Sequence, residues 1–218
     1  MLEFNRVLDI QIGADHCSTA MVRTFLKLAT PPDQWGTLPS QIEIGREVFI
    51  TGGNPPELWS PPETNMGFLR RHFNDVKFVQ GESSGLLALE GELKRRRIVA
   101  ILCQDLLPDE EHPFGYPNDG DQGHYEFVRA TKGRLALVGD PSRLIPGNRR
   151  WFNADGVVLS QPFEHQPGFS LQQRSIYLME LSHLLPNWWD RCVPPNPGVY
   201  FKPFISVDPA SRRPAVSL

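Results

Sequence analysis

Residues 98–103, Ile-Val-Ala-Ile-Leu-Cys, are the stretch that decides the fold. An unbroken apolar run rich in β-branched side chains is typical of a strand that is buried on both faces. Residues 86–97, which precede this strand, have the composition of a helix, and the polar pair Gln104-Asp105 follows it. A helix that leads into a fully apolar strand predicts a sheet with helices packed against it.

The same alternation of helices and strands extends along the chain. We expect helices at residues 15–29, 63–73, 86–97, 124–131 and 170–185, and strands at residues 6–12, 41–44, 47–51, 75–80, 98–103, 134–138, 156–160 and 199–207. Short apolar strands that alternate with helices predict an α/β fold with a doubly wound, mostly parallel sheet and helices on both faces, a Rossmann-like three-layer sandwich. We expect a single α/β domain over residues 1–207 and a flexible C-terminal tail over residues 208–218.

Composition excludes several classes of protein. The chain has 218 residues, of which 40% are hydrophobic, so it can bury a sizeable core. Its net charge of −3 argues against a large nucleic-acid footprint, and no apolar run reaches the roughly 18 residues of a membrane helix. The cysteines Cys17, Cys103 and Cys192 lie too far apart for a disulfide framework, which predicts a reducing, cytoplasmic location. The basic cluster at residues 94–97 fits a solvated helix end, with a phosphate-binding patch as the alternative.

Polar turns follow several of the expected strands. In an open parallel sheet, ligands bind beyond the carboxyl ends of the strands, where such turns would gather. The turn at residues 81–85 is the best anion-binding candidate, because its small residues open a helix whose dipole favours negative charge. Its residues would bind the ligand together with other turn residues: Gly52, Gly53, Gly81, Ser83, Ser84 and Ser142. The acid or base would come from Glu82, Asp105 or Asp140. The alternative is that these are ordinary turn residues.

A long acidic segment at residues 105–126 contains a possible divalent-metal site. The candidate ligands, which combine imidazole and carboxylate groups, are His112, Asp119, Asp121 and His124. The sequence Asp119-Gly120-Asp121 resembles the acid-x-acid motif of metal-dependent glycosyltransferases, which implies a bound metal. The alternative is a solvated acidic lid.

Cys17 and Arg23 satisfy the pattern C-x5-R. This pattern, placed after the first strand, resembles that of low-molecular-weight cysteine phosphatases. The resemblance implies a thiolate nucleophile at Cys17 and a phosphate held by Arg23. Residues 21–29 also have helical spacing, which competes with a phosphate-binding loop and would make Cys17 a thiol at the start of a helix.

These features favour an enzyme, a transferase or a hydrolase, that acts on a small phosphorylated or nucleotide-type ligand bound at the strand ends. The first alternative is a non-enzymatic protein-interaction module that uses the proline-rich loops and the pair Trp188/Trp189. The second alternative is phosphatase-like activity at Cys17.

Overall fold

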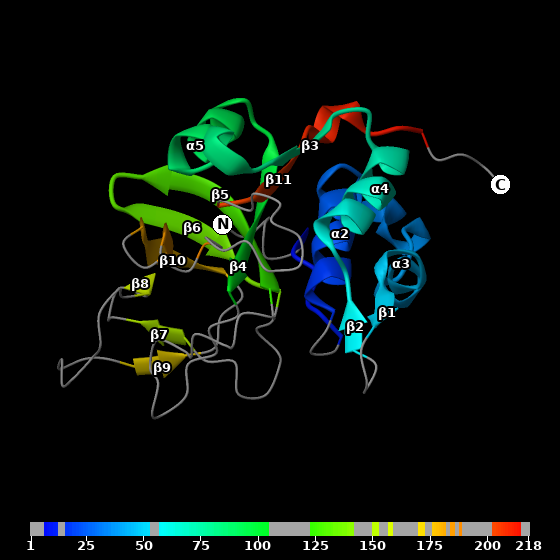
Figure 1. Ribbon diagram of the computed structural model, residues 1–218, viewed down its shortest axis with the longest axis horizontal. Helices are drawn as coiled ribbons and strands as arrows, with labels where there is room; N and C mark the ends of the chain where they lie inside the picture. The colour runs from blue at the N-terminus through cyan, green and yellow to red at the C-terminus, as the bar shows by residue number, and fades with distance from the viewer. Residues whose placement is uncertain are drawn as a thin grey trace.

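The computed structural model describes residues 7–12, 16–52, 57–104, 123–141, 150–152, 157–158, 170–172, 176–181, 184–185, 188 and 202–214. Three helices and a short hairpin lie on one side of the molecule, and a sheet with a further helix lies on the other (Figure 1). Among the described helices, none has the length and apolar character needed to cross a membrane.

The first group of elements is helical and confirms two of the expected helices. It contains α2 (Cys17–Leu28), the 3₁₀ helix η1 (Pro32–Thr37), α3 (Gln41–Val48) and α4 (Pro62–His72). α4 begins with a proline in its first turn, where the missing N–H costs no hydrogen bond. Strand β1 (Ile50–Gly52) pairs antiparallel with β2 (Glu57–Trp59).

α3 occupies residues for which we predicted strands. Ser40 and Glu43 form a capping box, in which the Ser40 hydroxyl accepts from the Glu43 N–H at 3.2 Å and the Glu43 carboxylate accepts from the Ser40 N–H at 2.8 Å. Gln41, Ile44 and Val48 are buried, at the spacing of one helix face. The capping signature Ser-x-x-Glu therefore outweighs the β-branched residues in this segment.

The sheet is antiparallel over most of its width, which shows that the predicted doubly wound, mostly parallel fold is wrong. Its strand order is β3-β11-β4-β5-β6-β10-β8-β7-β9, and the β10–β8 pair is parallel while all other described pairs are antiparallel. The strands in chain order are β3 (Val76–Val79), β4 (Ile98–Gln104), β5 (Gly123–Lys132), β6 (Leu135–Gly139), β7 (Arg150–Phe152), β8 (Val157–Val158), β9 (Ser170–Gln172), β10 (Ile176–Glu180) and β11 (Phe204–Val207). Because the sheet is not parallel, the Rossmann-like, nucleotide-binding interpretation is wrong as well.

The apolar pattern of β4 has a different cause from the one we inferred. β4 is buried on both faces, because α2 and α4 cover one face of the sheet and α5 (Leu86–Lys94) covers the other. On the first face Phe25 of α2 meets Phe127 of β5, with ring centroids 5.2 Å apart. On the second face Ile101 packs with Leu89 of α5 and with Trp188. A central antiparallel strand between two layers of helices is as apolar as a parallel one.

Two segments predicted as helices are strands. Residues 123–132 form β5, and residues 170–172 and 176–180 form β9 and β10. Along β5 the side chains alternate, since Tyr125 and Phe127 enter the core beneath α2 while Val128 enters the core beneath α5.

A buried arginine ties α5 to two strands. The Arg97 Nε donates to Ser206 Oγ at 2.7 Å and lies 2.7 Å from a Glu92 carboxylate oxygen, and its guanidinium also pairs with Asp75. Burial raises the pKa of Glu92, but the hydrogen bond from Ser206 and the charges of Lys77 and Arg97 outweigh it, so the net shift is downward. The hydrogen bond from Arg97 lowers the pKa of Asp75.

The C-terminal residues continue beyond β11 through the 3₁₀ helix η3 (Pro209–Ser211). The Asp208 N–H donates to Asp75 O at 3.1 Å, and the Arg213 N–H donates to His72 O at 2.8 Å. Residues 208–213 are therefore bound to the end of α4 and the start of β3. The domain limits of 1–207 and the flexibility of the tail stay predictions.

Replacing Arg97 tests the buried cluster. Arg97→Met leaves the Glu92 carboxylate buried beside an apolar side chain, so we expect the free energy of unfolding to fall by about 3–5 kcal/mol in urea titrations. Arg95→Met is the matched control, because Arg95 also pairs with Glu92 but its side chain is 68% exposed. The control should lose less than about 1 kcal/mol. Equal losses in the two variants would contradict the role of Arg97.

His72 predicts a loss of stability in acid. Burial, followed by the charges of Arg212 and Arg71, lowers its pKa from 6.5 to about 4. The unfolded chain then binds a proton more readily than the folded chain, so the contribution of His72 is complete above pH 6.5 and declines as the pH falls to about 4. In His72→Gln this decline should be shallower, which urea titrations of both proteins across that window will measure. Parallel curves for the two proteins would contradict the assignment.

Candidate functional site

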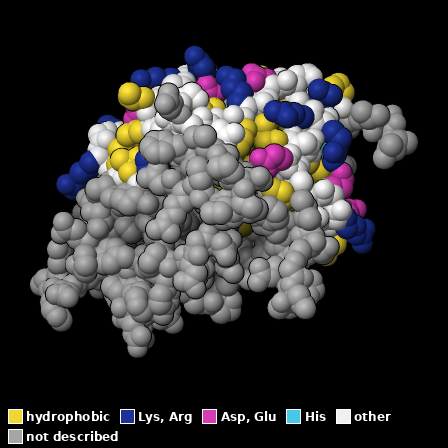
Figure 2. All heavy atoms as spheres, in the orientation of Figure 1, with side chains coloured by type: hydrophobic (Ala, Val, Ile, Leu, Met, Phe, Trp, Pro, Cys, Tyr) yellow, Lys and Arg dark blue, Asp and Glu magenta, His cyan; other side chains and the backbone are white. Residues whose placement is uncertain are grey.

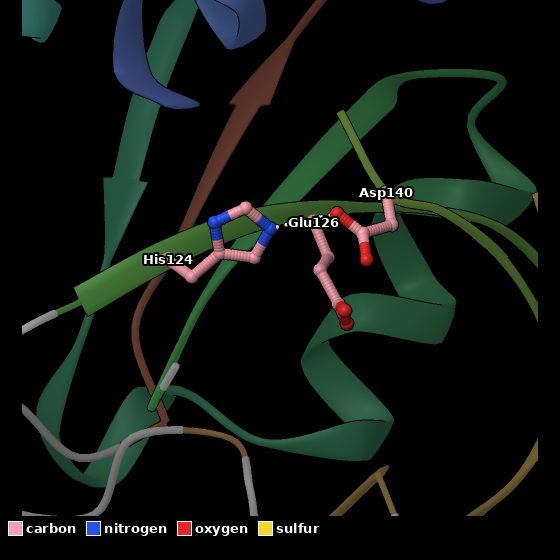
Figure 3. A group of neighbouring side chains, drawn as sticks. All are labelled: His124, Glu126 and Asp140. Carbon is pink, nitrogen blue, oxygen red and sulfur yellow. Dashed lines mark hydrogen bonds and ion pairs between the residues drawn. The ribbon is translucent and has the colours of Figure 1, made fainter. Parts of the chain in front are cut away.

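Two of the predicted site residues meet at one end of the sheet. His124 lies near the start of β5, and Asp140 directly follows β6, the strand that pairs with β5. His124 Nε2 lies 2.8 Å from Asp140 Oδ1, and the two side chains are 4% and 1% exposed. An ionised carboxylate only accepts hydrogen bonds, so with Asp140 ionised Nε2 is the donor of this bond. Figure 3 shows Nδ1 on the side of the ring that faces away from Asp140.

Glu126 and Cys103 lie beside this pair. Glu126 is two residues beyond His124 on β5, so both side chains leave the same face of the strand. Cys103 is opposite His124 in the β4–β5 register, and its thiol lies 3.7 Å from Glu126 Oε2. One potential ligand atom each from His124, Glu126 and Asp140 lies within 4.8 Å of the other two, and all three residues are buried. An imidazole and two carboxylates in this arrangement could hold a divalent metal ion.

Cys17 is the first residue of α2, which contacts β5. Cys17 is half-buried and packs against the core that includes Tyr125. Tyr125 and His124 are adjacent in β5 and leave it on opposite faces, so Cys17 and His124 lie on opposite sides of the sheet. The Gln11 N–H, six residues before Cys17, donates to Pro141 O at 3.0 Å, which places Gln11 beside the corner that carries Asp140.

A buried polar joint holds the segment at residues 9–12 along α2. The Asp9 carboxylate accepts from Arg23 at 2.7 Å and from Gln41 Nε2 at 2.8 Å, and it also pairs with Lys27. Gln41 Oε1 accepts from the Ile12 N–H at 3.2 Å. Side chains of α2 and α3 hold this segment, so these two helices determine where Gln11 lies.

The phosphate-binding loop expected from the C-x5-R pattern is not formed. Residues 17–28 are helical, and the Arg23 guanidinium donates to Asp9 and to Pro39 O, the latter at 3.0 Å. A loop that wraps a phosphate needs successive N–H groups turned toward one centre, whereas a helix uses them internally after its first turn.

The predicted anion-binding turn lies at the same end of the sheet as Asp140, but on a distant strand. It follows β3, four strands from β6, or about 19 Å at the usual spacing of neighbouring strands. Gly81 has a φ of +72° and begins the 3₁₀ helix η2 (Gly81–Ser83), whose backbone includes Glu82. The hydroxyls of Ser83 and Ser84 donate to the main-chain carbonyls of Gln80 and Gly81. Gly52 ends β1. The remaining predicted residues lie outside the described part of the chain: Gly53, Asp105, His112, Asp119, Asp121 and Ser142.

We predicted that Trp188 and Trp189 form a surface for a protein partner, but Trp188 is not exposed. This side chain is fully buried, and its indole N–H donates to Pro203 O at 2.8 Å. Trp189 lies outside the described residues.

The basic cluster at residues 94–97 is exposed only in part: residues 94–96 are exposed at the end of α5, whereas Arg97 is buried. Figure 2 shows Lys and Arg side chains spread among acidic ones over the described surface in this view.

No family model matches the chain, and no curated protein matches it at a significant level. The chemistry of the site therefore has to be argued from its own residues. Sequence reasoning missed Gln11 and Glu126 as site residues, and it assigned His124 and Asp140 to separate sites.

The reactivity of the two described cysteines should differ widely. Cys17 is half-buried at a helix N-terminus, whereas Cys103 is 3% exposed within a central strand. Alkylation of Cys103 requires the sheet to open at a cost of about 5 kcal/mol, so iodoacetamide should modify Cys17 faster by about 10³-fold or more. Mass spectrometry of the two peptides over time measures both rates. Comparable rates would contradict the difference in burial between the two thiols.

Proposed function

We propose that the protein hydrolyses ester or amide bonds, with His124 as the general base and Asp140 as the carboxylate that orients it. The observation that carries this proposal is the buried His124–Asp140 hydrogen bond at one end of the sheet. A carboxylate that holds one nitrogen of a histidine orients the ring and stabilises its protonated form, as hydrolytic sites require.

The tautomer supports the role of His124. With an ionised Asp140 as the acceptor, Nε2 is the donor, and Nδ1 is the nitrogen that would take a proton from an attacking water. A buried carboxylate also stabilises the imidazolium that forms when the proton arrives.

The reaction would proceed by direct attack of water. His124 takes a proton from the water as the water oxygen attacks the carbonyl carbon, and a tetrahedral intermediate forms. His124 then gives this proton to the leaving amine or alcohol as the intermediate collapses to the acid.

Hydrolysis of p-nitrophenyl acetate tests this assignment directly. His124→Ala should lower the rate by about 10²-fold or more, because the general base is removed. Asp140→Asn keeps an oxygen that can accept from Nε2 and should lose less activity than Asp140→Ala.

Cys17→Ser is the matched control, because Cys17 lies on the opposite face of the sheet from His124. It should keep the activity of the wild type. Equal losses in Cys17→Ser and His124→Ala, or no loss in His124→Ala, would exclude the proposed mechanism.

A further inference from the structure

We propose that Cys103, His124, Glu126 and Asp140 together form a binding site for one divalent cation of the zinc class. The site goes beyond the proposed hydrolytic function and does not depend on it, because it stands on the position and the chemistry of four side chains at one end of the sheet.

Three of the donor atoms are already grouped. His124 and Glu126 leave β5 on the same face, and Asp140 lies just beyond the neighbouring strand β6 (Figure 3). One potential ligand atom from each of these residues lies within 4.8 Å of the other two, and His124 Nε2 is 2.8 Å from Asp140 Oδ1. Nitrogen and oxygen ligands of one tetrahedral zinc ion lie about 3.4 Å apart, so this pair has to separate by only about 0.6 Å to admit the ion.

Cys103 supplies a fourth donor on the same face. It is directly opposite His124 in the β4–β5 register, and side chains that face each other across two strands project from the same side of a sheet. Its Sγ lies 3.7 Å from Glu126 Oε2. Zinc binds sulfur at about 2.3 Å and oxygen at about 2.0–2.2 Å, so two such ligands of a tetrahedral ion lie about 3.6 Å apart. The observed separation is therefore close to that of two ligands on a shared ion.

The strands that carry the donors hold them in place. β4 and β5 are paired along residues 99–104 and 123–128, and both strands are packed into the core on each face of the sheet. The register of such a pair cannot slip without moving apolar side chains out of the core. Three of the four donors are thus fixed relative to one another, and a site whose ligands need little rearrangement binds its ion more tightly.

The chemistry of the donor set selects the class of metal. A thiolate, an imidazole and two carboxylates suit Zn²⁺, and similarly Co²⁺, whereas Ca²⁺ needs six to eight oxygen ligands and Mg²⁺ retains its waters. None of the four residues is more than 3% exposed, so the carboxylates attract a cation through a medium of low effective dielectric. In this respect the group differs from an exposed acidic cluster, whose charges are screened by water.

The site shares His124 and Asp140 with the proposed general base. An ion bound to both side chains takes the place of the hydrogen bond between them, so one molecule cannot use the pair for both purposes at the same time. Binding of metal and hydrolysis of ester by the metal-free protein are therefore measured separately.

Zinc titration by calorimetry, on the full chain, tests the site. The wild type should bind one equivalent of Zn²⁺. Glu126→Gln and Cys103→Ser should each bind at least about 10-fold more weakly, because loss of a group that merely supports a ligand already costs about that much. Glu90→Gln is the matched control, since Glu90 lies on α5 and accepts from Thr131. It should bind zinc as the wild type does.

Cobalt titration tests the thiol by itself. Co²⁺ takes the same ligands as Zn²⁺, and a thiolate bound to it gives a sulfur-to-cobalt charge-transfer band in the near ultraviolet. The wild type, Cys17→Ser and Cys192→Ser should all show this band, and Cys103→Ser should lack it. A band that is lost in Cys17→Ser or Cys192→Ser, but kept in Cys103→Ser, would overturn the assignment of Cys103 as a ligand.

Two further results would overturn the site: no binding of zinc by the wild type, or wild-type affinity in Glu126→Gln. Glu126→Asp, which keeps the charge but shortens the side chain, is the second variant if Glu126→Gln does not fold, and it should also weaken binding. Failure of the metal site leaves the hydrolytic proposal standing, and absence of hydrolysis leaves the metal site standing, so the two failures are distinguishable.

Discussion

Burial of β4 and β5 between two layers of helices is the constraint on which the rest of the structure depends. Alternate side chains of both strands enter the two cores, beneath α2 and α4 on one face and beneath α5 on the other. A strand buried on both faces has room for polar side chains only near its ends. That is where β4 carries Cys103 and β5 carries His124, with Asp140 just beyond β6. The site is therefore a consequence of where the apolar layers stop.

The second requirement is the joint between the helical group and the sheet. Asp9 and Gln41 bind the segment that precedes α2 to the helices, and the Gln11–Pro141 hydrogen bond binds it to the sheet. Because a single segment carries both attachments, it joins the helices α2 and α3 to the corner that bears Asp140.

The sequence predicts those elements whose local pattern agrees with their burial. α2, α4 and β4 have apolar residues at the spacing that their packing requires, and they lie close to where the patterns indicated. The direction of strand pairing has no such local signal, because a central antiparallel strand under two helix layers is as apolar as a parallel one. β5 was missed for another reason: its buried polar residues at positions 124 and 126 made the inward-facing side look solvated.

The partnership of His124 and Asp140 depends on a turn that the sequence does display. Gly133 and Arg134 lie between β5 and β6, and Gly133 has a φ of +59°, as a tight hairpin turn requires. A hairpin at this turn pairs β5 with β6 and so brings His124 and Asp140 to the same end of the sheet. The predicted helix over residues 124–131 did not allow for this pairing. Two buried polar side chains on such a hairpin cost stability that apolar residues would not. Proteins place polar residues at buried positions mainly where a functional site requires them. The buried polar residues His124 and Asp140 therefore argue for a function at this end of the sheet.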